Sequence, residues 1–507
     1  MFPQPKPDSY HEGFNERLFA AVPSRAKRIL EVGCAGGRLG HELKLQDPSR
    51  YVAGAERDPE AAQLAGERLD DVFVLDVEVD LPPIEPGSLD CILFGDVLEH
   101  LVDPEDTLRR YRDLLSDDGL VLVSLPNAQH YSVIKSLLRG DFMYQPAGLL
   151  DATHLRFFTS MSFAKLMLDA GFLPKVEDRI RSGVGEQFIH AAAPLLTHSR
   201  VHPDTALEPI DTFQYIVSGS KLPTAPAGFA TAPITLVACV DDDDQLESNL
   251  LRSPCLEPGT PHETILMRRQ TSAAEGFNNA LEKARHDLVV FVPQDIYLPR
   301  GWDSRFLEQF HTAEERFKTI GVAGVFGYTF GPDGKTDLGR VLDRQLLYDM
   351  PAPLPAEADG LGEIVLAVRR DTPLRFDPDL GFHLYGVDIC LSARRQGLAV
   401  AVLDAPCLNN SLFAYLSPEF HSARERLLAK WPDVRPLHSG MGDLDTMRPQ
   451  PVPTTWVEEL RQQVDDLERE LASARSRLDD RLRHIANMEG SAFWKLRNAV
   501  HRALRRG

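Results

Sequence analysis

One stretch near the amino-terminal end, residues 28–40, constrains the fold of this chain more than any other. It consists of an apolar strand, an acid near the end of that strand, a tight turn of small residues and the start of a helix. Glycines allow positive φ angles and let the backbone approach a ligand closely. A helix N-terminus adds unpaired N–H groups and a partial positive charge. The stretch therefore predicts a nucleotide-like ligand lying across the turn.

Apolar runs alternate with helical patterns over the first 221 residues, which is typical of a parallel α/β sheet. We predict a helix at residues 104–115 and strands at residues 28–32, 51–55, 72–75, 89–94, 120–124 and 213–217. Ligands of open α/β sheets bind beyond the carboxyl ends of the strands. The residues that follow each strand are therefore the candidate site residues.

The glycine turn does not fit the dinucleotide fingerprint G-x-G-x-x-G/A, because Ala35 and Arg38 stand at its second and third glycine positions. The order Glu31-x-Gly33-Cys34-Ala35-x-Gly37 instead resembles motif I of class I S-adenosylmethionine (SAM) methyltransferases. Three further blocks follow the later strands in the same order as in the ubiquinone-biosynthesis-like group of that family. They are Asp76, residues 94–101 and residues 124–127, and the resemblance covers most of residues 15–220.

The resemblance implies a Rossmann-like fold with SAM as cofactor. It implies that Glu31 faces the methionine end, that Asp76 holds the adenine amino group, and that a set of turn and strand-end residues completes the site, namely Gly33, Cys34, Ala35, Gly37 and Asp96. Glu56 closes the second strand, where its carboxylate can accept both ribose hydroxyls. The same spacing also serves NAD enzymes, so Glu56 alone does not discriminate between the two cofactors.

Two histidines are candidates for the base that removes a proton from a hydroxyl acceptor. His100 lies just past the fourth strand, near the expected position of the methyl group, and His154 lies in a block that recurs in methyltransferases of this type. The alternative for both is that they only cap or bridge local structure.

A Pro- and Ala-rich linker at residues 222–232 separates domain 1–221 from a second α/β domain at residues 233–440. Its first strand runs into four acids that begin at Asp241, which fit either a solvated turn or a nucleotide-sugar pocket. A small-residue helix entry at residues 272–281 contains Asn278, and a buried strand ends at Gln294-Asp295. Together these blocks resemble a family-two-type glycosyltransferase with the GT-A fold.

This second resemblance implies a nucleotide sugar as donor, contacted by Asp241, Asn278 and Asp295. It also implies a divalent cation, Mn²⁺ or Mg²⁺, on Asp295, because a leaving diphosphate needs a cation and hard cations prefer carboxylate oxygen. Asp388, at the start of a helix, takes the place of the catalytic base of an inverting enzyme, or is simply an acid favoured by the helix dipole. The sequence departs from the family pattern at Gln294 and at Asn409, which puts metal dependence in doubt.

The tail, residues 441–507, carries a heptad seam that predicts a coiled coil and, most simply, a parallel homodimer. The seam consists of Val457, Leu460, Val464, Leu467, Leu471, Ala474 and Leu478. One long helix packed on its own domain is the alternative. The last residues form a basic amphipathic end, which predicts either peripheral contact with an anionic membrane or the close of the coiled coil.

Composition limits the classes of function. The net charge is −20, from 55 basic and 75 acidic residues, which argues against a nucleic-acid partner bound through a general basic field. Six scattered cysteines fit a reducing cytoplasm, and no apolar run reaches the length of a spanning helix.

The sequence thus predicts a bifunctional enzyme of surface-glycan biosynthesis that acts on a glycan or lipid-linked glycan acceptor. We place it in the cytoplasm, peripheral at the inner face of the membrane. Two alternatives stay open. The second domain could bind glycan without catalysis, as Gln294 and Asn409 favour, or the chain could be an assembly scaffold.

Overall fold

The computed structural model describes residues 14–447, apart from 184, 199–200, 202, 318, 332–333, 345, 351, 412–415 and 435, together with five single positions in the tail (469, 473, 475, 477 and 481). The chain divides into a compact unit that ends at Met447 and a second unit, Arg448–Gly507. The predicted heptad seam and basic end lie outside the described residues, so the coiled coil, the homodimer and the membrane contact stay predictions.

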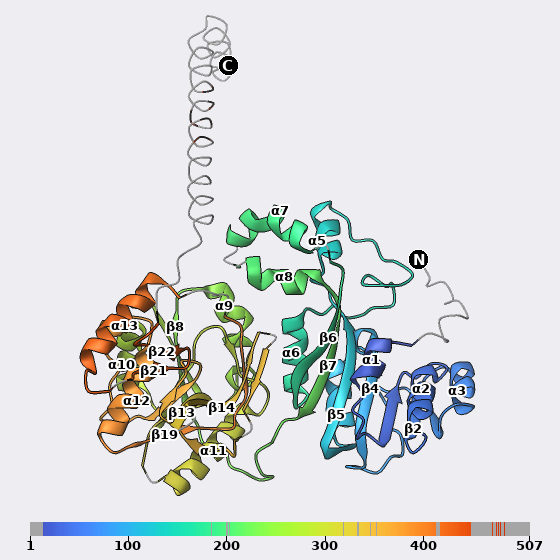
Figure 1. Ribbon diagram of the computed structural model, residues 1–507, viewed down its shortest axis with the longest axis horizontal. Coiled ribbons are helices and arrows are strands. Elements are labelled where there is room, and N and C mark those ends of the chain that lie inside the picture. The colour runs from blue at the N-terminus through green and yellow to red at the C-terminus, as the bar shows by residue number, and fades with distance from the viewer. Residues whose placement is uncertain are drawn as a thin grey trace, which may run out of the picture. The chain divides into compact units, whose positions relative to one another are not determined.

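The first half of the compact unit is a seven-stranded sheet in the order β3-β2-β1-β4-β5-β7-β6 (Figure 1). Strands β1 to β5 are parallel, and β7 pairs antiparallel with both β5 and β6. The strands are β1 (Arg28–Val32), β2 (Tyr51–Glu56), β3 (Asp71–Val74), β4 (Leu89–Gly95), β5 (Leu115–Pro126), β6 (Phe172–Arg181) and β7 (Thr212–Lys221). The six predicted strands are present, whereas β6 was not predicted.

Helices cover both faces of this sheet, and its central strands are therefore buried on both sides. One apolar cluster joins the sheet to α4 and α6, and another joins it to α1, α2 and α3. The helices of this half are α1 (Glu16–Ala21), α2 (Arg38–Gln46), α3 (Pro59–Gly66), α4 (Pro104–Arg112), α5 (Tyr131–Leu138), α6 (Ser160–Asp169), α7 (Gly185–His198) and α8 (Pro203–Asp211), with the short 3₁₀ helix η2 (Leu98–His100) after β4.

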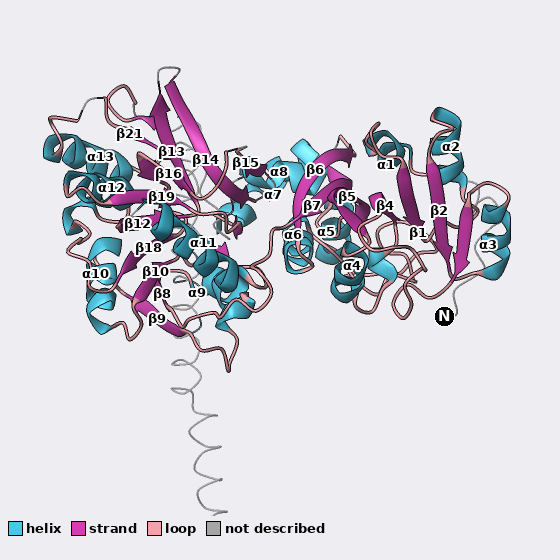
Figure 2. Ribbon diagram, turned by 90° about the horizontal axis from the view of Figure 1, so that it is seen from below, coloured by secondary structure: helices cyan, strands magenta, loops and turns pink. Residues whose placement is uncertain are grey.

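The second half contains a mixed seven-stranded sheet in the order β16-β19-β12-β18-β10-β8-β9 (Figure 2). Strand β18 runs antiparallel to its neighbours β10 and β12, whereas β8 is parallel to β9 and β10. The strands are β8 (Thr235–Val240), β9 (Glu263–Arg268), β10 (Leu288–Phe291), β12 (Ile320–Gly324), β16 (Ala356–Glu357), β18 (Leu366–Arg369) and β19 (Ala399–Val402).

Apolar side chains of α11 pack on one face of this mixed sheet, and those of α10 and α12 pack on the other. The helices of this half are α9 (Asp243–Ser248), α10 (Ala273–Lys283), α11 (Trp302–Phe317), α12 (Tyr385–Arg395) and α13 (Pro418–Lys430), with 3₁₀ helices η3 (Leu250–Arg252), η4 (Pro254–Leu256) and η5 (Pro378–Leu380). A six-stranded sheet lies beside it, built from β11 (Ile296–Tyr297), β13 (Phe326–Gly331), β14 (Gly334–Asp343), β15 (Leu346–Asp349), β17 (Gly360–Leu361) and β20 (Cys407–Asn409), and β21 (His438–Ser439) pairs with β22 (Gly442–Asp443).

The two halves share an apolar cluster, which we call the bridging cluster. Its buried members are Ala164, Leu168, Leu173, Tyr297, Leu342 and Leu408. The Tyr297 hydroxyl donates a hydrogen bond to the Asp169 carboxylate at 2.5 Å. Tyr297 is the position two residues after Asp295 where a second metal-binding acid could have stood, and here its side chain takes part in packing between the halves.

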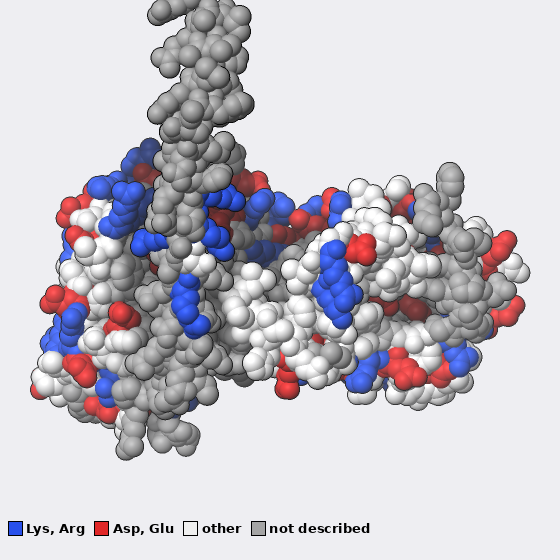
Figure 3. Space-filling model, turned by 90° about the horizontal axis from the view of Figure 1, so that it is seen from above, with Lys and Arg blue, Asp and Glu red and all other residues white. Residues whose placement is uncertain are grey.

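Basic and acidic side chains are interspersed on the face drawn in Figure 3, and the described residues form no continuous basic field there. Within the part of the chain that the structure describes, no helix combines the length and the hydrophobicity needed to cross a membrane.

Candidate functional site

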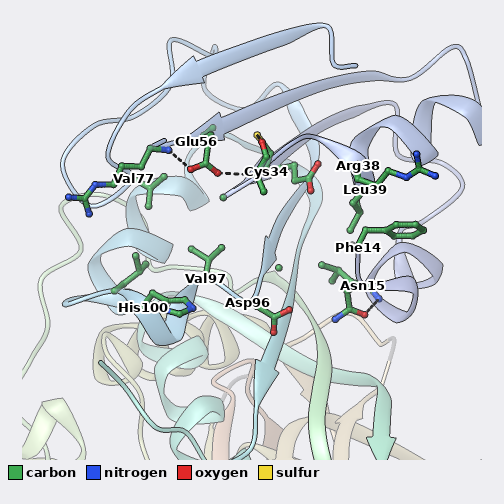
Figure 4. A pocket seen from close by; sticks show the side chains of 18 of the residues that line it. Phe14, Asn15, Cys34, Arg38, Leu39, Glu56, Val77, Asp96, Val97 and His100 are labelled. Carbon is green, nitrogen blue, oxygen red and sulfur yellow. Dashed lines mark hydrogen bonds between the residues drawn. The ribbon is translucent and has the colours of Figure 1, made fainter. Parts of the chain in front are cut away.

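The carboxyl ends of β1, β2 and β4 open onto a cavity of about 860 Å³ in the first half of the compact unit (Figure 4). Its lining includes the predicted site residues Glu31, Gly33, Cys34, Ala35, Glu56, Asp76, Asp96 and His100. These residues come from four separate segments of the sequence, and the parallel sheet brings them to one edge. In Figure 4, Glu56 and Cys34 lie on one side of the cavity, and Asp96 and His100 lie on the opposite side.

The turn after β1 is held in an unusual backbone conformation. Gly33, Ala35 and Gly37 have φ angles of 67°, 47° and 71°. A Cβ atom at Gly33 would lie 2.6 Å from Val97 Cγ2, so only glycine leaves Val97 in place at the cavity wall. Gly37 does not line the cavity, and instead serves as the N-cap of α2. Gly37 thus shapes the turn, and its predicted contact with the cofactor stays a prediction.

Glu31 is a strongly perturbed acid of this cavity. Glu31 as a whole residue is 8% exposed, and its carboxylate accepts a hydrogen bond from the Gly40 backbone N–H at 3.0 Å. Burial raises the pKa of Glu31 to about 8, the Gly40 N–H opposes this shift, and the charge of Glu56 adds to it. Glu31 therefore holds a proton near neutral pH unless a cationic ligand group approaches.

Replacing Glu31 with glutamine should change how stability depends on pH. The pKa of Glu31 is higher in the folded state, about 8, than the ordinary 4.5 of the unfolded chain. The stability that protonated Glu31 contributes is thus complete below about pH 4.5 and is lost as pH rises toward 8. We expect the free energy of unfolding of the wild type, relative to Glu31→Gln, to fall by roughly 1–3 kcal/mol between pH 5 and pH 8. Urea denaturation followed by circular dichroism checks this, and parallel pH profiles would contradict it.

Glu56 is fixed by the backbone around it. One carboxylate oxygen accepts from the Ala35 N–H at 2.8 Å, and the other accepts from the N–H groups of Arg57 and Asp58 at 2.8 and 2.9 Å. Asp76 lines the same cavity and forms an ion pair with Arg57 at 3.8 Å. Glu56 and Asp76 thus lie on the same side of the sheet edge, as a ligand spanning both requires.

Asp96 follows β4 with a positive φ of 54°, which turns the chain sharply at the cavity. Its backbone N–H donates to Ser124 Oγ at 3.0 Å, and its carboxylate accepts from the Gln214 amide. Burial raises the pKa of Asp96, while the hydrogen bonds and the nearby His100 oppose that shift.

The two predicted histidines are neighbours. The rings of His100 and His154 meet edge to face with centroids 4.9 Å apart. Nδ1 of His100 lies 3.1 Å from the Thr153 carbonyl oxygen, and Nδ1 of His154 lies 3.3 Å from the Leu149 carbonyl oxygen. His100 lines the cavity, and the His154 ring contacts the His100 ring. The structure thus brings together two candidate bases that are 54 positions apart in the sequence.

In the second half, acids gather where β8 and β10 end. Gln294 accepts from the backbone N–H groups of Asp241 and Asp242 at 3.0 and 3.1 Å, and its amide donates to the Asp241 carboxylate. Burial raises the pKa of Asp295 to about 6, and the charges of Asp343 and Asp241 add to that rise. Asp241 and Asp295, both predicted, thus lie close enough to interact, and Gln294 links the two strand ends.

Asp343 is a member of this group that sequence reasoning missed. Its carboxylate accepts from the Asn409 amide at 3.2 Å, and burial raises its pKa. Asp343 ends β14, which pairs in parallel with β20, and this pairing places it beside Asn409. The only local signal was an acid that directly follows the apolar pair Val341-Leu342.

Asn278 does not face this group of acids. Its side-chain amide donates to the Phe376 carbonyl at 2.8 Å and accepts from the Phe376 N–H at 3.0 Å. Both polar atoms of the amide thus bind one backbone segment. This arrangement favours a structural role for Asn278 in place of the predicted nucleotide contact.

Asp388 is fully buried, with a relative exposure of 0%. Its carboxylate pairs with Lys430 Nζ at 2.8 Å and accepts from the Trp431 indole N–H at 2.8 Å. A carboxylate held this way cannot reach an acceptor hydroxyl without breaking both contacts. The structure therefore argues against Asp388 as the catalytic base and for the alternative, a structural acid.

Glu363 is another acid that the sequence did not single out. It accepts from the Gly386 N–H at 2.8 Å, at the start of α12. Burial raises the pKa of Glu363 to about 7. No recognisable block surrounds it, so its place beside α12 could only come from the fold.

Two family models match the chain, a methyltransferase domain over residues 10–174 and a glycosyltransferase-like family over residues 235–431. A ubiquinone biosynthesis O-methyltransferase of Neisseria meningitidis is 29% identical over 156 residues, which make up 29% of this chain and 64% of that protein. Another, from Dinoroseobacter shibae, is 27% identical over 171 residues, 32% of this chain and 66% of that protein. The chain thus spans less than two thirds of the length of each of these relatives.

Among solved structures, a SAM-dependent methyltransferase from Archaeoglobus fulgidus aligns with 42% of this chain and 97% of its own, at 15% identity and a TM-score of 0.31.

Proposed function

Since residues 10–174 match the family model of a methyltransferase domain and residues 235–431 match that of a glycosyltransferase-like family, we propose that the chain is a bifunctional enzyme of surface-glycan biosynthesis. The first half methylates a sugar hydroxyl, and the second transfers a sugar from a nucleotide donor to a glycan. Holding both sites on one chain keeps an acceptor at high effective concentration near each. We place the enzyme in the cytoplasm, at the inner face of the membrane.

The observation that carries the methyltransferase proposal is the gathering of Glu31, Glu56, Asp76 and Asp96 around one cavity. Its volume, about 860 Å³, lies in the range of small-molecule sites. The glycine at position 33 leaves open the space that a side chain would take from the cavity wall. The residues therefore fit SAM, with Glu56 and Asp76 on its nucleoside and Glu31 toward its amino acid end.

SAM, when bound, supplies an electrophilic methyl group. The chain's own residues hold the nucleoside, line up the acceptor oxygen and remove its proton. His100 reaches the cavity from the side opposite Glu56, which suits a role at the acceptor.

A segment beside the histidines supports an acceptor that carries a lipid. Phe142, Met143, Tyr144, Leu155 and Phe157 are all exposed, and the Phe157 ring contacts both Phe142 and His154. Contiguous exposed apolar side chains mark interaction sites. A lipid-linked glycan would place its apolar part on this segment and its sugar toward His100.

Calorimetry on the full chain tests the proposal with S-adenosylhomocysteine and with nucleotide sugars, followed by transfer assays with methyl-labelled SAM. Saturable binding of both ligand classes is expected. If one of the two ligand classes shows no saturable binding, the corresponding half of the proposal is overturned.

For the second half, we expect Asp295→Asn to weaken Mn²⁺-dependent binding of uridine diphosphate by about fivefold or more, because a neutral amide is a poorer ligand for a hard cation. The matched control is Asp287→Asn, directly before β10, where the side chain is 82% exposed. Calorimetry with and without Mn²⁺ measures both variants. Equal binding by Asp295→Asn and wild type would contradict a catalytic site of this kind.

A second candidate function for this half is glycan binding without catalysis. It is favoured by the ion pair that occupies Asp388 and by Gln294 and Asn409 at positions where metal ligands were expected. It predicts glycan binding that neither Mn²⁺ nor Asp295→Asn affects.

A further inference from the structure

Glu99, His100 and His154 form a compact group of potential metal ligands at the edge of the cavity. One ligand atom from each residue lies within 4.8 Å of the others. Ligand atoms around one cation are about 3–3.5 Å apart, given ligand bonds of about 2.1 Å. Small rotations of the side chains would close the difference.

One ring nitrogen of each histidine is already engaged by the backbone. Each Nδ1 faces a backbone carbonyl oxygen, that of Thr153 or that of Leu149. A carbonyl oxygen only accepts hydrogen bonds, so Nδ1 must carry the proton in the neutral ring and the lone pair lies on Nε2. Ligating histidines in metal sites are typically fixed by this kind of bond from the other ring nitrogen.

Glu99 is held against the same segment. It is 1% exposed, and its backbone carbonyl accepts from the N–H groups of Leu155 and Arg156 at 2.8 and 3.0 Å. These bonds fasten η2 to the segment that carries His154. The three side chains thus belong to two elements that the backbone keeps together before any ion binds.

We propose that Glu99, His100 and His154 bind a divalent transition-metal ion, of which Mn²⁺, Co²⁺ and Zn²⁺ are examples, and that this ion binds the acceptor hydroxyl. Two imidazoles with one carboxylate suit such ions better than Mg²⁺, which prefers an all-oxygen shell. Three protein ligands leave positions open, as in catalytic sites. Since His100 lines the cavity, an ion held by this group would lie at the edge of the cavity.

This inference rests on the proposed methyl transfer and assigns the acceptor side of it. In this arrangement the two histidines act as ligands in place of a base, and the bound cation would lower the pKa of the acceptor hydroxyl, whose proton passes to solvent water. The acceptor oxygen then forms a bond to the methyl carbon while the carbon–sulfur bond breaks and its electron pair stays on sulfur. The products are a methyl ether and S-adenosylhomocysteine. An acceptor with two adjacent hydroxyls, as in a sugar diol, could occupy two open positions at once.

The test titrates Mn²⁺ into the full chain and follows it by electron paramagnetic resonance. All proteins in the series carry Asp295→Asn, so that the second half does not add a signal. We expect one saturable site, weakened at least tenfold by His154→Ala and by Glu99→Gln. His41→Ala, which removes a histidine of the same half outside the group, is the matched control and should bind like its parent.

Thermal unfolding shows whether each variant is folded, and His154→Gln serves as the conservative replacement if alanine destabilises the chain. Calorimetry with S-adenosylhomocysteine is run on the same samples, and His154→Ala should bind it within about twofold of its parent. Methyl transfer should fall at least tenfold on chelation and return with Mn²⁺.

The outcomes separate the two proposals. If Mn²⁺ does not saturate, or if folded His154→Ala and Glu99→Gln bind it as the parent does, the metal site is wrong while S-adenosylhomocysteine binding can still support methyl transfer. If Mn²⁺ binds as expected but S-adenosylhomocysteine does not, the proposed methyl transfer fails, and the metal site stands without the role assigned to it.

Discussion

Replacing Gly33 with alanine should weaken S-adenosylhomocysteine binding by about ten- to hundredfold. The new Cβ would lie 2.6 Å from Val97 Cγ2, so Val97 must move, and the space beside it is the cavity. Overpacking of this kind costs about 1–3 kcal/mol. The positive φ of 67° adds about 1–2 kcal/mol of backbone strain in the folded state. Calorimetry on the full chain measures the loss of affinity, and thermal unfolding measures the strain.

Gly87→Ala is the matched control for this prediction. Gly87 has a φ of 71°, close to that of Gly33, but a Cβ there would meet no atom within 4 Å. The control should therefore lose a comparable amount of stability through strain and keep its affinity. If Gly33→Ala bound the ligand as well as Gly87→Ala does, the turn after β1 would not be the ligand cradle.

Asp388→Ala should lower the free energy of unfolding by about 1–3 kcal/mol. The substitution leaves the buried Trp431 N–H without its acceptor and removes one of the two carboxylates that Lys430 contacts. A buried donor left without its acceptor costs about 1–3 kcal/mol, whereas Lys430 is 37% exposed and keeps its ion pair with Asp377. Chemical denaturation followed by tryptophan fluorescence is suitable, because Trp431 itself reports on this region.

Asp371→Ala, at an exposed acid in the same half, is the control for Asp388→Ala and should stay within about 0.5 kcal/mol of the wild type. A different result for Asp388→Ala itself would restore the interpretation of Asp388 as the catalytic base. If Asp388→Ala kept its full stability but lost sugar transfer, Asp388 would have to act as a base in spite of its ion pair.

The strands of the first half could be predicted because each is an apolar run bounded by turn residues, and a parallel sheet brings the ends of such runs to one edge. Glu56 and Asp76 could therefore be assigned to the site from their positions at the ends of strands alone. Strand β6 was missed because its residues mix Pro174 with charged side chains and are only partly buried. It is a strand because it pairs with β7 at the sheet edge, and that pairing is not a property of its own sequence.

The roles of Asn278 and Asp388 could not be predicted, because their partners are distant in the chain. Phe376 lies 98 positions from Asn278, and Lys430 lies 42 positions from Asp388. A motif gives the residue type and its place on a helix, but not the group that the tertiary fold sets against it. The same limit hid Asp343, which joins Asp295 through the pairing of β14 with β20.

The bridging cluster affects how the two halves could be produced separately. A break in the linker would uncover Tyr297, Leu342 and Leu408 on one fragment and Ala164, Leu168 and Leu173 on the other. Asp169 would lose the phenol that donates to it. Each fragment would then expose an apolar surface to solvent and tend to aggregate. The two activities are therefore best separated by point substitutions in the intact polypeptide.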